Sequence, residues 1–180
     1  SMVEIIPAIL PANEVDLKNK VEGLPKGIDH FHLDVLEEDY WTKIDRPFEV
    51  HLMVPDPESL MRRWLERGAK RIIAHQPTPE ILKHRGTVEI GLGFELQVPI
   101  GDVLAEASFT DFVHIMSISE IGEQGHPLDP RVFDRIKAIQ EKFPQLPISV
   151  DGGITNENYQ NLIEAGADRL VVGSHFKDLW

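Results

Sequence analysis

Apolar residues along the chain occur in short runs, and each run is closed by polar residues, glycine or proline. The run at residues 30–35 shows this most clearly, because Phe31, Leu33 and Val35 alternate with His32 and Asp34. An alternation with a period of two is typical of a β-strand. On this basis we predict eight strands, at residues 4–10, 30–35, 48–54, 71–75, 88–94, 112–118, 147–154 and 169–176.

Helical patterns lie between several of these strands. In residues 56–69, Leu60 and Trp64 fall on one face, Asp56 is the expected N-cap and Gly68 the expected end of the helix. Three further stretches follow the same plan, at residues 98–109, 129–143 and 155–168. The helical segments therefore alternate with the strands along most of the chain.

This alternation favours parallel strands joined by helical crossovers. Eight such units indicate an α/β fold, a compact (β/α)8 TIM barrel formed by one domain over residues 1–180. Barrels of this type rarely have fewer than about 200 residues. Some helices must therefore be shortened or missing. We expect a loop or one turn, and no full helix, in residues 36–47, and no eighth helix after Phe176. An open, doubly wound sheet is the alternative fold.

Composition bears on the partners rather than on the fold. A net charge of −12 argues against nucleic acid and against anionic membranes. The chain has no cysteine, which excludes disulfides and thiolate metal ligands and is compatible with a cytoplasmic location. No apolar run reaches the roughly 18 residues of a membrane helix. We expect a cytoplasmic protein without membrane or nucleic-acid partners.

Chemically useful side chains follow several of the predicted strands. In a (β/α)8 barrel the C-terminal ends of the strands form the active site. The polar residues near these ends are His32, Asp34, His51, His75, Ser117, Asp151, Ser174 and His175. Two carboxylates and two imidazoles would suit Zn²⁺, Fe²⁺, Mn²⁺ or Co²⁺. The alternative is that each histidine is a hydrogen-bonded core residue and each aspartate a helix cap.

Glycines follow the last two predicted strands. Gly152 and Gly153 come after one strand, and Gly173 and Ser174 end the next. Backbone N–H groups in such loops bind phosphate, and the loops after strands seven and eight are the usual phosphate site of these barrels. These residues therefore predict a phosphate site, although turns alone also use glycine.

The chain resembles the ribulose-phosphate 3-epimerase family in several motifs that occur in order along most of its length. These are PAIL, FHLDV, VHLMVPDPE, RIIAH, VHIMS, SVDGGI and EAGADRLVVGS. The resemblance implies a barrel of the ribulose-phosphate-binding type. It also implies an isomerase of the pentose phosphate pathway that interconverts D-ribulose 5-phosphate and D-xylulose 5-phosphate by epimerisation at C3.

The resemblance also implies roles for individual residues. One divalent metal ion, Zn, Fe, Mn or Co, would be bound by His32, Asp34, His51 and Asp151. Asp34 and Asp151 would also act as the catalytic acid and base. Substrate or phosphate contacts would fall on His75, Met53, Met116, Gly152, Gly153, Gly173 and Ser174.

The chain departs from the family around the substrate. Ala8 stands where the family usually has serine, and the loops after strands two and six have different sequences. Gly122 and Gly125 are expected to replace part of the phosphate-closing loop. Two alternatives therefore remain: a related phosphosugar isomerase, aldolase or decarboxylase-like barrel, and a barrel that only binds metal or phosphate.

The missing helices also bear on assembly. A strand flank that has lost its helix leaves apolar surface that something must cover. We therefore expect a homo-oligomer. The candidate contact residues are Trp41, Trp64 and Trp180.

Overall fold

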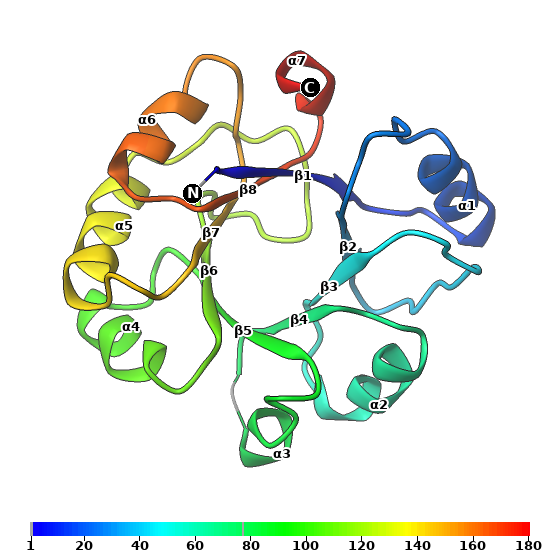
Figure 1. The fold of residues 1–180 in the computed structure, drawn as a ribbon, viewed down its shortest axis with the longest axis horizontal. Helices are drawn as coiled ribbons and strands as arrows, with labels where there is room; N and C mark the ends of the chain where they lie inside the picture. Colours follow the sequence, from blue (N-terminus) through cyan, green and yellow to red (C-terminus); the bar gives the residue numbers. More distant parts are fainter. Residues whose placement is uncertain (1, 77) are drawn as a thin grey trace.

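The computed structural model describes residues 2–76 and 78–180. Its strands form a closed parallel barrel in which each strand pairs with the next and β8 pairs with β1 (Figure 1). The strands are β1 (Glu4–Ile9), β2 (Phe31–Val35), β3 (Phe48–Leu52), β4 (Arg71–Ala74), β5 (Glu89–Phe94), β6 (Phe112–Met116), β7 (Ile148–Asp151) and β8 (Arg169–Val172). The predicted (β/α)8 barrel is confirmed, and the open sheet is wrong.

Helices surround the ring of strands (Figure 1). In the described residues they are α1 (Glu14–Glu22), α2 (Glu58–Glu66), α3 (Pro79–Leu82), α4 (Ile100–Ala107), α5 (Arg131–Lys142), α6 (Tyr159–Ala165) and α7 (Phe176–Leu179). As predicted, the described chain has no full helix between β2 and β3. No helix was predicted after β8, but Phe176–Leu179 form one short helical turn, α7. Because one connection has no full helix and the last helix is a single turn, 180 residues are enough to close the barrel.

The helix ends agree only partly with the predictions. Gly68 follows α2 with a φ of +92°, a conformation that glycine adopts without strain, so the predicted helix end is confirmed. The predicted N-cap role of Asp56 is wrong. Pro57 takes the cap position with helical backbone angles, and no side chain caps α2. The helix predicted from Thr155 starts at Tyr159, because Thr155 and Asn158 first bond within a turn.

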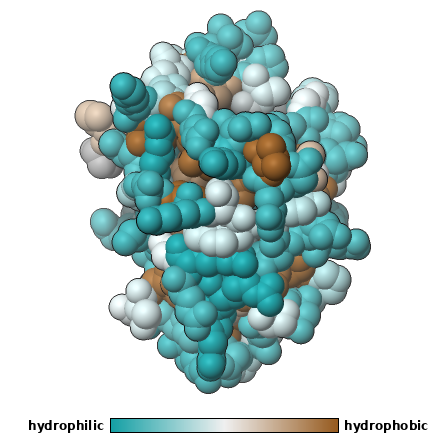
Figure 2. Space-filling view, turned by 90° about the vertical axis from the view of Figure 1, so that its right-hand side faces the viewer, coloured by the Kyte–Doolittle hydropathy of each residue, from teal (hydrophilic) through white to brown (hydrophobic). Residues whose placement is uncertain are grey.

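The flank between β2 and β3 is covered by the loop of residues 36–47, which runs between α1 and α2 in Figure 1. Trp41 from this loop packs edge-on against Trp64 of α2, with ring centroids 5.7 Å apart, and also lies 6.1 Å from Phe48. Trp64 is fully buried, so its predicted role as a contact between subunits is wrong. Figure 2 shows this side of the molecule as mostly hydrophilic with small, separate hydrophobic patches.

One face of the strands packs against the helices, and the other faces the barrel interior. Leu33 and Val35 of β2 belong to an apolar cluster that also contains Trp64 of α2, so this face packs against the helices. By alternation, His32 and Asp34 point into the barrel. The neighbouring strands repeat the arrangement, which gives the barrel interior several buried polar residues, namely His32, Glu49, His51, His114 and Ser149.

Candidate active site

The site begins with the register of four strands. Asp34 of β2 lies beside His51 of β3, and Asp151 of β7 lies beside Met116 of β6. Each of these residues is at or near the C-terminal end of its strand. The barrel therefore brings residues that are far apart in the sequence to one mouth.

The four predicted metal ligands come together there. Asp34 Oδ1 lies 3.0 Å from His32 Nε2 and 3.5 Å from His51 Nδ1. Asp151 Oδ2 lies 3.6 Å from His32 Nε2 and 3.5 Å from His51 Nδ1. Both carboxylates thus face the same two imidazole nitrogens.

The imidazoles and the carboxylates differ in their exposure to solvent. The His32 and His51 side chains are fully buried, whereas Asp34 and Asp151 keep 11% and 16% of their side-chain exposure. The carboxylates are therefore the members of the group that a molecule entering from the mouth can touch.

Further contacts fix the imidazoles. His32 Nδ1 lies 2.6 Å from Glu49 Oε2, and Arg71 Nε donates to the other oxygen of Glu49 at 2.8 Å. His51 Nε2 lies 2.6 Å from His75 Nε2. An imidazole that donates one ring N–H to such a partner directs its other nitrogen, as a lone pair, toward the shared centre.

The titration of the group reflects this crowding. Burial alone would raise the pKa of Asp151, but its hydrogen bond with His114 and its contact with His51 outweigh burial and lower that pKa well below its usual range. Burial alone would lower the pKa of His32, but its contacts with Asp34 and Glu49 raise that pKa well above its usual range. A proton on His32 and a cation in the centre are alternative countercharges for the same carboxylates.

The donor set fits a divalent cation. Ligands about 2.0–2.2 Å from an ion lie about 3.0–3.5 Å from their neighbours, which agrees with the 3.0–3.6 Å separations in this group. His51 Nδ1 is buried and makes no hydrogen bond within the described residues, although both carboxylates surround it. A buried nitrogen without a partner is costly, and a metal ion satisfies it.

One member of the cluster was missed by the sequence analysis. His114 of β6 lies with Nε2 2.9 Å from Asp151 Oδ2 and belongs to a group of four potential ligands, with His32, His51 and Asp151. A single histidine between Val113 and Ile115 is most simply interpreted as a core residue. The available signal was its spacing, two residues before Met116 on the same face of the strand.

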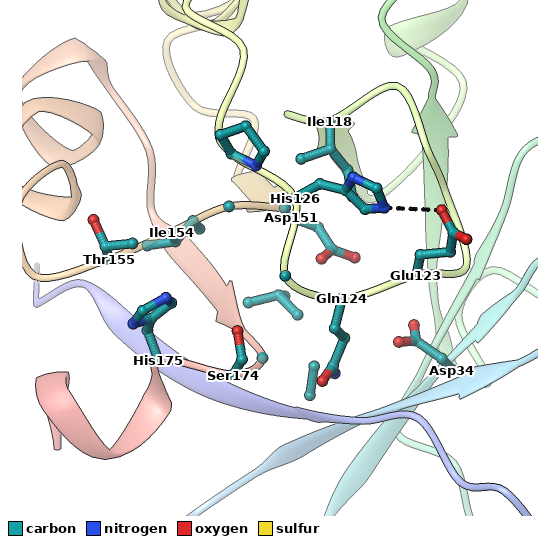
Figure 3. A pocket seen from close by; sticks show the side chains of 17 residues that line it. Asp34, Ile118, Glu123, Gln124, His126, Asp151, Ile154, Thr155, Ser174 and His175 are labelled. Atoms are coloured by element: carbon teal, nitrogen blue, oxygen red, sulfur yellow. Dashed lines mark hydrogen bonds and ion pairs between the residues drawn. The ribbon is translucent and has the colours of Figure 1, made fainter.

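A cavity of about 280 Å³ opens next to this cluster. Figure 3 shows Asp34 and Asp151 directed into it, with Ser174 and His175 from the loop after β8 on another side. Its lining includes most of the predicted phosphate residues, namely Gly125, Gly152, Gly153, Gly173 and Ser174. A second hollow, which contains Met53, shares Asp34 with the first.

The remaining predicted residues lie around this centre. His75 contacts His51, and Met116 is buried at the end of β6. Gly122 is not among the residues that line the cavity, and it lies against the side chain of Leu36. Gln124, which the sequence analysis did not single out, lies directly over the backbone of Gly173.

The fold and the site together define a (β/α)8 barrel that combines a cluster of histidine and aspartate with a glycine-lined cavity at the C-terminal ends of its strands. A comparison with family profiles matches residues 4–177 to the ribulose-phosphate 3 epimerase family. The chain belongs to this family of isomerases, and the prediction of family and enzyme class is confirmed.

Individual relatives agree with this assignment. The ribulose-5-phosphate-3-epimerase of Arabidopsis thaliana chloroplasts is 30% identical, over 97% of this chain and 71% of its own length. The ribulose-phosphate 3-epimerase of Bacillus subtilis is 27% identical, over 96% of this chain and 91% of its own length.

Solved structures support the fold. A tryptophan synthase alpha-subunit from Pyrococcus furiosus superposes with a TM-score of 0.70, at 15% identity, over 97% of this chain and 88% of that one.

None of the helices in residues 2–76 and 78–180 has the length and apolar character needed to cross a lipid bilayer.

Proposed function

We propose that the protein epimerises a ketopentose 5-phosphate at C3 and interconverts D-ribulose 5-phosphate and D-xylulose 5-phosphate with the aid of one divalent cation. The observation that carries the proposal is the position of Asp34 and Asp151. They come from β2 and β7, contact the same two imidazoles and line the same cavity. Inversion of a carbon centre needs one group on each face of the substrate, and two carboxylates on separate strands meet that need.

The proton transfers fall to the two carboxylates. One aspartate removes the proton from C3, and the other delivers a proton to the opposite face. Contacts with the neighbouring imidazoles, His32 foremost for Asp34 and His114 foremost for Asp151, outweigh burial and hold the pKa of each carboxylate below its usual value, so both stay ionised. When bound to His32, His51 and the two aspartates, the cation supplies positive charge that stabilises the negative charge developing on the substrate oxygens.

The phosphate group would occupy the end of the cavity formed by the loops after β7 and β8. Gly152 and Gly153 have φ values of +125° and +68°, a backbone conformation that leaves room for a close approach of an anion. His175 and His126 also line the cavity, as does Glu123, whose Oε2 lies 2.9 Å from His126 Nε2. Glu37 and Glu38 line the other hollow beside Asp34 and are unfavourable neighbours for an anionic group there.

A second candidate is the same proton transfer on a different phosphorylated sugar. Ala8 lines the cavity in place of a hydroxyl residue, and Gln124 covers Gly173. Both features alter the space around the substrate and leave the carboxylates in place.

We also propose the cytoplasmic location that the sequence predicts. One of the relatives is a chloroplastic enzyme.

The test is a conversion assay. Protein stripped with a chelator is reloaded singly with Zn²⁺, Fe²⁺, Mn²⁺ or Co²⁺ and mixed with D-ribulose 5-phosphate, and D-xylulose 5-phosphate is detected by NMR. We expect conversion with at least one cation and none with the stripped protein. Absence of conversion with all four cations contradicts the proposal, and a panel of other phosphorylated ketoses then tests the second candidate.

A further inference from the structure

His114 is the histidine of the cluster that the proposed function leaves without a role. It is fully buried in β6, and its ring stacks on His32 with a centroid distance of 5.3 Å and meets His51 edge-on at 4.7 Å. Its Nε2 points to Asp151 Oδ2 at 2.9 Å. This is the same oxygen that faces His32 Nε2 and His51 Nδ1.

The ligand atoms of His32, His51, His114 and Asp151 all lie within 4.8 Å of one another. Two ligands of one ion are at most about 4.2 Å apart when each bond is about 2.1 Å long, so the widest separation within this limit would have to close by about 0.6 Å when an ion binds. Asp34 reaches the same centre from β2 through His32 and His51. The barrel thus presents a third imidazole to the ion site, in addition to the four predicted donors.

We propose that His114 is an additional nitrogen ligand of the divalent cation, so that the centre uses three imidazoles together with its carboxylates. The inference rests on the cation of the proposed function. It concerns which residues hold that cation and is independent of the sugar on which the enzyme acts.

The other ring nitrogen of His114 supports this role. His114 Nδ1 lies 3.0 Å from Ser149 Oγ, which is its partner position on β7. When Nδ1–H donates to Ser149, Nε2 carries a lone pair directed at the centre. Metal-binding histidines usually donate their second N–H to such a partner, as His32 does to Glu49.

The contact with Asp151 is consistent with shared coordination. A lone pair on His114 Nε2 and the carboxylate oxygen at 2.9 Å would repel each other unless a proton or a cation lies between or beside them. Neighbouring ligands of one ion have this separation. The competing interpretation is that His114 Nε2–H donates to Asp151 and only positions it.

A third imidazole has a chemical consequence. Nitrogen ligands suit Zn²⁺ and Co²⁺, whereas Mn²⁺ prefers an environment of oxygen ligands. The proposed ligand set therefore predicts that His114 raises the affinity of the site for Zn²⁺ and Co²⁺ more than its affinity for Mn²⁺.

The direct test uses the wild-type protein loaded with Co²⁺ and labelled with ¹⁵N-histidine. Each histidine bound to Co²⁺ gives one strongly shifted exchangeable ring N–H signal in the proton NMR spectrum. The proposal predicts three such signals, from His32, His51 and His114. Two signals overturn it. Because this measurement needs no substitution, it does not depend on the folding of a variant.

Variants give the second test. His114→Gln is expected to lower Co²⁺ and Zn²⁺ affinity at least tenfold, to change the visible absorption of bound Co²⁺, and to lower Mn²⁺ affinity less. Ile115→Leu, a conservative change at the next position of the same strand, should leave all three unchanged. An unchanged Co²⁺ spectrum in His114→Gln means that His114 only positions Asp151, and it overturns the proposal.

These measurements contain no sugar, so their failure is distinct from that of the proposed function. Conversion of D-ribulose 5-phosphate by a protein with two shifted signals supports the epimerase and rejects the His114 ligand. Three shifted signals in a protein that converts no ribulose 5-phosphate support the ligand and reject the epimerase.

Discussion

Glu49 Oε2 lies 2.6 Å from His32 Nδ1 in the fully buried interior of the barrel. This contact fixes the tautomer of His32 and sends its other nitrogen toward Asp34 and Asp151. Arg71 in turn donates to Glu49, which links the cation centre to charges deeper in the barrel. Glu49 is therefore expected to influence the centre without touching a substrate.

The first prediction follows from this contact. Glu49→Gln keeps the shape of the side chain and removes the charge that orients His32. We expect Zn²⁺ affinity to fall about 10–100-fold, measured by competition with a chelator. Glu89→Gln is the matched control, because Glu89 is largely exposed and its side chain faces Arg71 and Arg169 instead of the centre. Equal Zn²⁺ affinities of Glu49→Gln and wild type would show that Glu49 has no role in cation binding.

The second prediction concerns Gly153. Its φ is +68°, and a methyl group at this position would lie 2.7 Å from Leu128 Cα. Gly153→Ala should therefore lower the free energy of unfolding by roughly 1–3 kcal/mol and weaken phosphate binding. Gly101→Ala is the control, because Gly101 lies in α4 with open space around it, and alanine there should add about 0.4–1 kcal/mol. Urea unfolding measures the free energy of unfolding of both variants, and equal values would contradict the prediction.

The third prediction concerns pH. Burial, then the neighbouring His51 and His114, lowers the pKa of His75 from 6.5 to about 3. Between these two values the unfolded chain binds more protons than the folded one, so stability falls as the pH is lowered. From pH 7 to pH 5 the wild type should lose about 1–2 kcal/mol more than His75→Gln. Parallel pH profiles of the two proteins in urea unfolding would refute this assignment.

The fourth prediction concerns assembly. Two of the three tryptophans that are expected to contact another copy of the chain in a homo-oligomer remain accessible. Trp180 is 57% exposed beside the short α7, and Trp41 is partly buried. We predict a mass in light scattering of at least twice the 20.4 kDa of one chain. A mass of a single chain would end this expectation.

The strands could be predicted from the sequence because they depend on local pattern. The two carboxylates could be assigned to one site because the C-terminal ends of all strands of a (β/α)8 barrel meet at one mouth. Strict alternation in residues 30–35 predicts that the apolar face of the strand packs against helices and that His32 and Asp34 lie on the opposite face. Elements with weak patterns were missed. Helix α1 has only Leu17 and Val21 buried, and its clearest signal was Asn13, whose side chain accepts the N–H of Asp16.

Residues whose role depends on the three-dimensional register could not be predicted in the same way. The contact of His114 with Asp151 arises because β6 pairs with β7 so that His114 faces Ser149. Trp64 was expected to contact another subunit although the sequence places it on the apolar face of its helix, and the folded chain shows that Trp41 packs against it. Gln124 likewise reaches Gly173 through a loop whose path no periodicity specifies.

The most direct test of the two-carboxylate account is exchange at C3 in deuterium oxide. Cation-loaded protein is mixed with D-ribulose 5-phosphate, and the loss of the C3 proton and the formation of D-xylulose 5-phosphate are followed by NMR. The account predicts deuterium at C3 of the product with the wild type and with Asp102→Asn, an exposed control on α4. It predicts a fall in conversion of about 10²–10⁴-fold in Asp34→Asn and in Asp151→Asn. Wild-type rates of conversion in either of these two variants would contradict it.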